Sequence, residues 1–174
     1  MMEERILNRL RAEAGLDAVG DSLPELLAYS ADCWPRQFVT RMYGGLPEER
    51  PAAVVRPRDV DSLCRVVAVC REEGVPVVPW GAGSGVCGGA NAVRGCVVVD
   101  LKRMNRLESV DPVSMTAWVE AGMNGMHLEE ALNERGCTLG HFPSSILCST
   151  VGGWVATRSA GQFSSRYGKI EDLV

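Results

Sequence analysis

The glycine-rich run at residues 79–91 constrains the fold of this chain more than any other segment. It reads PWGAGSGVCGGAN, has five glycines between positions 81 and 89, and follows the apolar run at 75–78. Glycine packs no side chain and loses much conformational freedom on folding, so such a cluster requires a sharp turn or a close approach to a ligand. Successive N–H groups in such a turn enclose an anion. The run predicts a phosphate-binding loop; the alternative is a flexible surface loop.

Two familiar nucleotide-binding motifs do not fit this loop. Residues 83–88 match the spelling G-x-G-x-x-G, but a Rossmann turn needs a helix that begins inside the glycine run. Only residues 90–95 separate the run from the apolar segment 96–101, which predicts a strand, so no helix fits there. A P-loop is excluded because no Gly-Lys-Ser/Thr follows. The sequence therefore predicts a glycine-rich loop that joins two strands.

The residues on either side of the loop predict a parallel β-α-β unit. Strands are expected over 52–55, 75–79 and 96–101, and a right-handed crossover joins the first two. The crossover helix is capped by Asp59 and ended by Gly74. One face of this helix is expected to carry Val60, Leu63, Cys64, Val67 and Cys70. A further helix is predicted over 3–14, and the proline- and glycine-containing segment 17–51 is expected to be irregular.

The pattern changes after residue 101. Residues 106–110 and 114–120 predict two antiparallel strands, and residues 125–135 and 150–158 predict two helices. The second helix is rich in small residues, which indicates that another element packs close to its backbone. The predicted fold class is α+β, with an N-terminal helical and irregular extension (1–51), a small parallel β-α-β subdomain (52–105) and a second subdomain with a mixed or antiparallel sheet (106–174).

Charge and cysteine spacing argue against several classes of partner. The 174 residues carry a net charge of −4 without a Lys/Arg-rich block, so neither nucleic acid nor an anionic membrane is expected as a partner. No apolar run suggests a signal peptide or a membrane span. The cysteines form no C-x-x-C pair, so we predict no metal site, thiols buried as small hydrophobes, and a cytoplasmic location. They are Cys33, Cys64, Cys70, Cys87, Cys96, Cys137 and Cys148.

The segment 143–161, PSSILCSTVGGWVATRSAG, is the second stretch that suggests chemistry. Ser149 or Thr150 can cap the helix that begins at residue 151, and the free N–H groups and dipole of that helix then provide an anion site. Thr157, Arg158 and Ser159 add hydroxyl groups and a guanidinium. The alternative is a tightly packed, capped helix that binds nothing.

Together these segments resemble the FAD-binding domain of the vanillyl-alcohol oxidase flavoprotein family, also called the PCMH-type fold. The resemblance covers residues 52–174 and rests on the order and spacing of VVRP at 54–57, PWGAGSG at 79–85, VVDL at 98–101, STVGG at 149–153 and YGKIEDLV at 167–174. Within the family, residues 152–161 look most like the alkyldihydroxyacetonephosphate synthase branch, because the glycolate oxidase branch has Asn where Arg158 stands. The resemblance implies a PCMH-type fold with FAD as cofactor.

The resemblance also implies which residues contact FAD. The loop at 79–91 would wrap the pyrophosphate, and the second segment would contact the flavin and complete the phosphate cradle. Many family members attach the flavin to a histidine in or near the first loop; this loop has none, so non-covalent FAD is expected. The implied contacts are Pro79, Trp80, Gly81, Ala82, Gly83, Ser84 and Gly85 in the first segment, and Pro143, Ser144, Ser145, Ser149, Thr150, Gly152, Gly153, Thr157, Arg158, Ser159 and Ala160 in the second.

Neither histidine is assigned a catalytic role. His127, at a predicted helix start, is expected to face solvent or cap the helix. His141 lies beside the second segment, where either a role in positioning FAD or substrate or a plain structural role fits. Nucleophilic Ser/His/Asp catalysis would need a G-x-S-x-G turn, which the sequence lacks. We assign no catalytic residue to this chain.

The resemblance implies an FAD-linked oxidoreductase that acts on a C–H or C–OH group, such as that of a 2-hydroxy acid. Two alternatives stay open: an alkyldihydroxyacetonephosphate synthase-like reaction without net redox change, and a non-catalytic nucleotide-binding or interaction module. Relatives continue past the position of residue 174 into more sheet and a substrate domain. We therefore expect the chain to bind small-molecule substrate only within a longer enzyme, to be inactive alone, and to expose a sheet edge through which copies pair.

Overall fold

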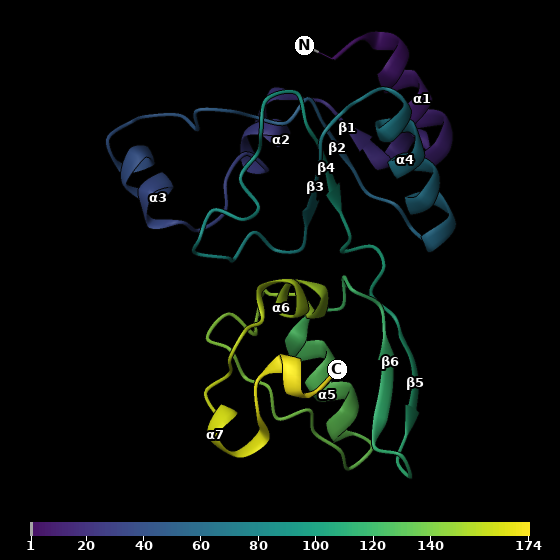
Figure 1. The fold of residues 1–174 in the computed structure, drawn as a ribbon, viewed down its shortest axis with the longest axis vertical. Helices are drawn as coiled ribbons and strands as arrows, with labels where there is room; N and C mark the ends of the chain where they lie inside the picture. The colour runs from purple at the N-terminus through teal and green to yellow at the C-terminus, as the bar shows by residue number, and fades with distance from the viewer. Residues whose placement is uncertain (1) are drawn as a thin grey trace. The chain divides into compact units, whose positions relative to one another are not determined.

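The computed structural model of the chain describes residues 2–174, which divide into two compact units (Figure 1). Unit 1 ends at Arg103, and unit 2 comprises Met104–Val174. Each unit has its own hydrophobic core, so each is described by itself. Unit 1 carries the glycine-rich loop, and unit 2 carries the segment 143–161.

Unit 1 is built on a four-stranded sheet with the order β1-β2-β4-β3. The strands are β1 (Val19–Gly20), β2 (Ala53–Val55), β3 (Val77–Trp80) and β4 (Val97–Asp100). Strands β2 and β3 both run parallel to β4, and β1 pairs antiparallel with β2. The prediction of parallel strands is therefore correct, but β2 and β3 are not neighbours, because β4 lies between them. Every residue of β4 is buried, as expected for a central strand covered on both faces.

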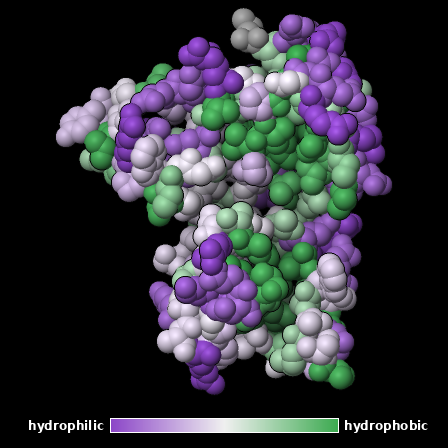
Figure 2. All heavy atoms as spheres, in the orientation of Figure 1, coloured by the Kyte–Doolittle hydropathy of each residue, from purple (hydrophilic) through white to green (hydrophobic). Residues whose placement is uncertain are grey.

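Two helices pack against each other and onto this sheet: α1 (Glu4–Ala14) and α4 (Val60–Glu72). Asp59 caps α4 as predicted, accepting the Ser62 N–H at 2.7 Å in a capping box. Leu10 of α1 and Val66 of α4 are fully buried between the helices and the sheet. Figure 2 shows that the outer side of α1 is covered by hydrophilic residues, so the helix is amphipathic.

The predicted apolar face of α4 is partly wrong. Leu63 is half-buried and Cys70 is buried, but three other predicted members are exposed, and Val66 and Val69 are buried instead. The exposed residues are Val60, Cys64 and Val67. Both sets have helical spacing, so the sequence pattern alone does not decide between them. The position of the sheet decides which stripe is buried.

Residues 17–51 are not irregular as predicted. After the 3-10 turn η1 (Leu16–Ala18) and β1, they form α2 (Leu23–Ala28) and α3 (Pro35–Met42). Pro24 and Pro35 occupy first-turn positions of these helices, where a missing N–H costs nothing and the fixed φ favours the helix. The prolines therefore lie in the first turns of helices, whereas the sequence predicts irregular structure around them. The segment also adds β1 to the sheet.

Unit 2 matches the predicted order of elements. The strands β5 (Leu107–Asp111) and β6 (Thr116–Val119) pair antiparallel, and α5 (Gly125–Asn133) and α6 (Val151–Thr157) follow. The chain closes with α7 (Ser164–Tyr167) and the 3-10 turn η2 (Ile170–Asp172). Asn124 caps α5 by accepting the N–H groups of Met126 and His127. Leu128, Trp154 and Ile170 form the centre of the core.

The cysteines do not all behave as buried hydrophobes. Cys70 and Cys96 are buried and burial raises the pKa of both thiols, to about 11 for Cys70. Four others are exposed, although the sequence predicts buried thiols there because apolar residues surround them. They are Cys33, Cys64, Cys87 and Cys148. Cys137 is intermediate. Between residues 2 and 174, no helix is long and apolar enough to cross a membrane.

Replacing Leu10 with Ala should destabilise unit 1, because the side chain is fully buried against α4 and the sheet. Removing it leaves a cavity, and we expect the free energy of unfolding to fall by about 2–5 kcal/mol. Leu16→Ala is the matched control, since Leu16 is 79% exposed and should change stability by less than about 0.5 kcal/mol. Urea unfolding followed by circular dichroism measures both variants. Equal stabilities would show that α1 is not part of the core.

Candidate cofactor site

The glycine-rich loop leaves β3 and reaches β4 without forming a helix, as the sequence predicts. It is held through its carbonyl groups. Four of its carbonyl oxygens accept hydrogen bonds. Two of the donors follow β4 in the chain, one lies in the segment before α3, and one lies in the loop itself. The acceptor–donor pairs are Trp80–Leu101 N (3.0 Å), Gly81–Lys102 Nζ (2.9 Å), Gly83–Cys33 N (3.1 Å) and Gly88–Asn91 N (3.1 Å).

The N–H groups of the same loop are unused. Within the described part of the chain, no backbone N–H of residues 81–89 donates a hydrogen bond to a protein acceptor. A run of nine unpartnered donors on a backbone anchored by its acceptors is an anion-binding arrangement. It can satisfy the oxygens of a phosphate or pyrophosphate without a lysine or a helix dipole.

The glycines of the loop serve two different purposes. Gly83 has φ +64°, and a Cβ there would lie 2.3 Å from the indole of Trp80, so the fold itself requires glycine. Gly88 also has a positive φ, +79°. A Cβ at Gly85 would meet only Asp32 at an ordinary 3.5 Å, and one at Gly89 would meet nothing within 4 Å. Packing inside the protein therefore does not explain glycine at 85 and 89.

A buried carboxylate fixes the start of the loop. Asp100 ends β4 and is 2% exposed; it accepts the Tyr29 hydroxyl at 2.6 Å and the Lys102 ammonium at 2.8 Å, with the Arg56 guanidinium 3.9 Å away. Lys102 in turn donates to the Gly81 carbonyl. Burial and the adjacent carboxylate raise the pKa of Tyr29, which therefore stays a hydroxyl donor. The sequence analysis gave Asp100 no role, and it missed Tyr29 and Lys102.

The segment before α3 holds the rest of the loop. Asp32, 5% exposed, accepts the Ala90 N–H at 3.5 Å and donates its own N–H to the Asn91 side chain at 3.0 Å. Cys33 donates its N–H to Gly83. These bonds join residues 50 or more positions apart, and no local pattern marks them. The sequence analysis missed this segment because it treated residues 17–51 as irregular.

In unit 2, the start of α6 differs from the expectation. Thr150 caps the helix, its Oγ1 accepting the Gly153 N–H at 3.4 Å. The N–H groups of Val151 and Gly152, however, donate to the carbonyls of residues 123 and 121 at 3.0 and 2.8 Å. The predicted free N–H groups are therefore occupied, and this seven-residue helix offers no anion site at its N-terminus. Ser149 is also used internally, because its Oγ accepts the Trp154 indole N–H at 2.7 Å.

The small residues of α6 pack closely at one position, as predicted. A Cβ at Gly152 would lie 2.9 Å from the Ala121 carbonyl oxygen, so the neighbouring backbone fills that space. A Cβ at Gly153 would meet only the capping oxygen of Thr150, at 3.3 Å. That distance is tighter than an ordinary contact, so a side chain at position 153 would press on the cap of α6.

The remaining predicted residues of unit 2 differ in exposure. Ser145 and Ser159 are half-buried and Pro143 is buried, whereas the others lie on the surface: Ser144, Thr157, Arg158 and Ala160. Arg158 ends α6 in the left-handed region, at φ 51°, and pairs with Glu171. The predicted cofactor residues fall into two groups, one in each unit. Unit 1 holds residues 79–85, and unit 2 holds residues 143–160.

The two histidines have opposite environments. His127 is exposed at the start of α5, as predicted. His141 is 1% exposed, with its Nε2 2.8 Å from the Ser159 hydroxyl and its ring edge-on to Trp154 at 4.8 Å. Burial lowers the pKa of His141 below its usual range, so the ring is neutral at neutral pH.

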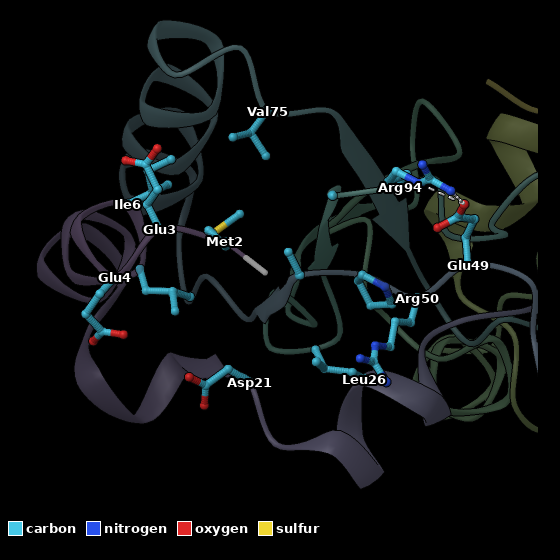
Figure 3. A pocket seen from close by; sticks show the side chains of 14 residues that line it. Met2, Glu3, Glu4, Ile6, Asp21, Leu26, Glu49, Arg50, Val75 and Arg94 are labelled. Atoms are coloured by element: carbon cyan, nitrogen blue, oxygen red, sulfur yellow. Dashed lines mark hydrogen bonds and ion pairs between the residues drawn. The ribbon is translucent and has the colours of Figure 1, made fainter.

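A cavity of about 700 Å³ in unit 1 contains none of the predicted cofactor residues (Figure 3). Its wall combines apolar side chains such as Ile6, Leu26 and Val75 with charged groups such as Glu3 and Arg50. No three His, Cys, Asp or Glu residues in the described chain are grouped so as to hold a metal ion. The glycine-rich loop is therefore the feature of unit 1 that best fits a cofactor.

The parallel sheet with its anchored, donor-rich loop, followed in the chain by the unit with antiparallel strands, defines a flavin-nucleotide-binding domain of the PCMH type. The chain belongs to the FAD binding domain family, which matches residues 51–174. Its cofactor is FAD. The predicted family, fold class and cofactor are confirmed.

Relatives of known sequence include two kinds of flavoprotein. The chain is 38% identical over 132 residues to the alkyldihydroxyacetonephosphate synthase of Dictyostelium discoideum, covering 74% of this chain and 22% of that protein. It is 31% identical over 174 residues to the glycolate oxidase subunit GlcD of Bacillus subtilis, covering 100% of this chain and 35% of that protein. The E. coli K12 FAD-linked oxidoreductase YgcU is 40% identical over 125 residues, with 71% of this chain and 26% of that protein covered.

Solved structures agree with this assignment. An alkyldihydroxyacetonephosphate synthase superimposes with a TM-score of 0.92 at 32% identity, over 99% of this chain and 35% of that chain. p-Cresol methylhydroxylase superimposes with a TM-score of 0.68 at 25% identity, over 83% of this chain and 27% of that chain. Among five curated sequence relatives, the chain spans between 21% and 35% of the length of the relative.

Gly83→Ala should destabilise unit 1, because the methyl group would collide with Trp80 and the backbone has a positive φ. We expect a loss of about 2 kcal/mol or more in the free energy of unfolding. Gly89→Ala, in the same loop but facing open space, is the matched control and should change stability by less than about 0.5 kcal/mol. Thermal or urea unfolding compares the two. A tolerated Gly83→Ala would contradict the two roles assigned to the glycines.

Proposed function

We propose that this chain binds FAD non-covalently, with the pyrophosphate against residues 81–89. The observation that carries the proposal is the run of backbone N–H groups in this loop that have no acceptor among the described residues. Glycine at 85 and 89, where a side chain would fit, supports a close approach of the ligand. The absence of histidine from residues 79–91 supports a dissociable flavin.

We infer that unit 2 carries cofactor-binding groups of its own. The hydroxyl groups of Ser144, Ser145 and Ser159 and the backbone at Ala160 are its available groups, since each is exposed or half-buried. The N–H and carbonyl of Gly153 already have partners in Thr150 and Thr157. Pro143, Ser149, Thr150 and Gly152 shape this surface from within, because packing or hydrogen bonds inside unit 2 already use them. Thr157 and Arg158 flank it, with Thr157 bonded to the Gly153 carbonyl at 2.9 Å.

We propose that the protein acts as an FAD-dependent oxidoreductase on a substrate with a CH–OH group, such as a 2-hydroxy acid. Bound FAD supplies the redox chemistry by accepting electrons from the substrate carbon, and the protein binds and orients it. The similarity to glycolate oxidase subunit GlcD and to YgcU supports this class. The residues of this chain hold the cofactor, and none of them is assigned to the chemical step, so we expect the chain alone to be inactive.

A second candidate is a reaction like that of alkyldihydroxyacetonephosphate synthase, without net redox change. Arg158 in the run 152–161 favours it, together with 34–38% identity to two such synthases and a TM-score of 0.92 to a solved structure of such a synthase. A non-catalytic nucleotide-binding module is the remaining alternative. Anaerobic mixing of 2-hydroxy acids with an FAD-loaded longer enzyme that contains this chain separates them: bleaching of the flavin spectrum supports the oxidoreductase, and an unchanged spectrum contradicts it.

Cytoplasmic location and pairing of copies stay predictions. The two-stranded sheet β5–β6 has no third strand in the described chain, and Trp118 on β6 is 75% exposed. Unpaired strand edges of this kind can join between copies. Size-exclusion chromatography coupled to light scattering measures the oligomeric state, and a monomer at all concentrations would contradict pairing.

Gly85→Ala should weaken FAD binding without weakening the fold. A methyl group at position 85 fits the protein at 3.5 Å from Asp32 but would occupy the space of the pyrophosphate. We expect the Kd for FAD to rise by about tenfold or more, which corresponds to about 1.4 kcal/mol. Titration of the chain with FAD, followed by flavin fluorescence, measures this. Val113→Ala, at a 92% exposed position of unit 2, is the control and should bind as the unsubstituted chain does.

Two results would count against the proposal. If the unsubstituted chain fails to bind FAD, the assignment of the cofactor site to these residues fails. If Gly85→Ala and the unsubstituted chain bind FAD equally while both are folded, the pyrophosphate does not lie against this part of the loop.

A further inference from the structure

His141 is the one described residue with a buried side-chain nitrogen or oxygen that lacks a hydrogen-bond partner. The ring is 1% exposed, and its Nδ1 has no partner in the protein. Its Nε2 lies 2.8 Å from the hydroxyl oxygen of Ser159. A buried polar atom without a partner costs free energy, so its presence calls for an explanation.

Contacts on both sides of His141 hold its main chain in place, and its ring packs against another aromatic ring. The His141 and Trp154 rings pack edge-on, with 4.8 Å between their centroids. The chain before His141 is fixed by Glu129, a buried carboxylate that accepts the Leu139 N–H at 3.2 Å. The chain after it is fixed where Phe142 accepts the Gln162 N–H at 2.8 Å. The position of His141 is therefore determined on both sides.

A neutral imidazole has one N–H group, on either Nδ1 or Nε2. Its location decides whether the unpartnered Nδ1 is a buried donor or a buried acceptor. If Nδ1 carried the proton, a buried N–H donor would have no acceptor. If Nε2 carries it, Nδ1 is only an unused lone pair, and Nε2–H donates to Ser159. Buried N–H groups without an acceptor are rarer in proteins than under-satisfied acceptors. The second tautomer is the favoured one.

We propose that His141 donates its Nε2–H to Ser159 and thereby turns the Ser159 hydroxyl proton toward the cofactor, which makes His141 a positioning residue. The backbone of Ser159 is already used, since its N–H donates to Trp154 at 3.0 Å and its carbonyl accepts from Ile170 at 3.2 Å. Its hydroxyl has no partner among residues 2–174 other than His141. The hydroxyl proton is thus available to an acceptor oxygen of the ligand.

The acceptor is an oxygen of FAD, either of a phosphate or of a flavin carbonyl. This step rests on the proposed function, since it assumes that FAD binds unit 2. A serine that could rotate freely would both donate and accept. A serine whose oxygen already accepts from His141 presents a defined donor, which favours an anionic or carbonyl oxygen over a ligand N–H group.

The tautomer is measured directly in the chain without cofactor. The chain has two histidines, so long-range ¹H–¹⁵N correlation spectra of ¹⁵N-histidine-labelled protein contain two sets of signals, and His127→Gln identifies those of His141. We expect His141 to have a protonated Nε2 and an unprotonated Nδ1. Protonation of Nδ1, or of both nitrogens at neutral pH, would overturn the proposal, whatever the affinity for FAD.

Substitutions test the effect on the ligand. Ser159→Ala and His141→Asn should each raise the Kd for FAD by about tenfold, because the first removes the donor and the second places its amide too close to the main chain to reach Ser159. His141→Gln carries an amide N–H at about the distance of Nε2 and should stay within about threefold of the unsubstituted chain. Melting temperatures identify variants that fail to fold.

The pattern across variants separates this role from a purely structural one. If folded His141→Asn binds FAD as tightly as the unsubstituted chain, or if His141→Gln binds as weakly as His141→Asn, the positioning role is excluded. Equal losses for FAD and ADP support an acceptor on the pyrophosphate, and a loss for FAD alone supports an acceptor on the flavin half. Absence of FAD binding by the unsubstituted chain contradicts the proposed function, whereas the nitrogen spectra decide the tautomer independently.

Discussion

Between residues 81 and 89, the protein holds the glycine-rich loop through carbonyl groups and not through N–H groups. A backbone that satisfied its N–H groups internally would be a stable turn with nothing to offer an anion. Here the buried Asp100 holds Lys102, and Lys102 holds the carbonyl of Gly81, while Cys33 holds that of Gly83. Several carbonyl groups of the loop are thereby engaged, while the N–H groups of residues 81–89 are left without protein acceptors. This polarity, more than the glycine content, supports the proposal that the loop binds a phosphate.

Unit 2 has a comparable centre in Trp154. Its indole N–H is bound by Ser149, its ring packs against His141, and it comes so close to Gly125 that a Cβ there would lie 2.1 Å away. The tryptophan therefore connects the start of α5, the cap of α6 and the segment that carries His141. Residues that the sequence suggests as direct ligands, Ser149 and Thr150 among them, instead hold this arrangement together. These residues lie beneath the surface of unit 2 that we propose contacts FAD.

The sequence predicted the elements well and the long-range contacts poorly. The glycine run, the capping Asp59 and the alternation of apolar segments are local signals, and they located the loop, α4 and the strands correctly. The face that α4 buries depends on where the sheet lies, and Val60 and Val66 belong to stripes with the same spacing. The prolines at 24 and 35 were ambiguous because proline both ends and begins helices.

The parts of the site that could not be predicted share one cause. Asp32 and Tyr29 act on residues about 60 to 70 positions away, and nothing in their immediate sequence indicates a partner. His141 could be marked as a candidate by its position, but its unpaired nitrogen appears only once the ring is seen to be buried. The occupied N–H groups at the start of α6 likewise follow from the neighbouring backbone at residues 121 and 123, which no local pattern reveals.

The match to the FAD binding domain family begins at residue 51, but the contacts that hold unit 1 together begin earlier in the chain. Strand β1 pairs with β2, Leu10 fills the space beneath the sheet, and Cys33 supplies the donor for Gly83. A piece cut at residue 51, where the family match begins, would lose a strand, part of its core and a tether of the glycine-rich loop. The segment matched by the family is therefore shorter than the segment whose contacts hold unit 1 together, and fragments for expression are better designed from hydrogen bonds than from the limits of that match.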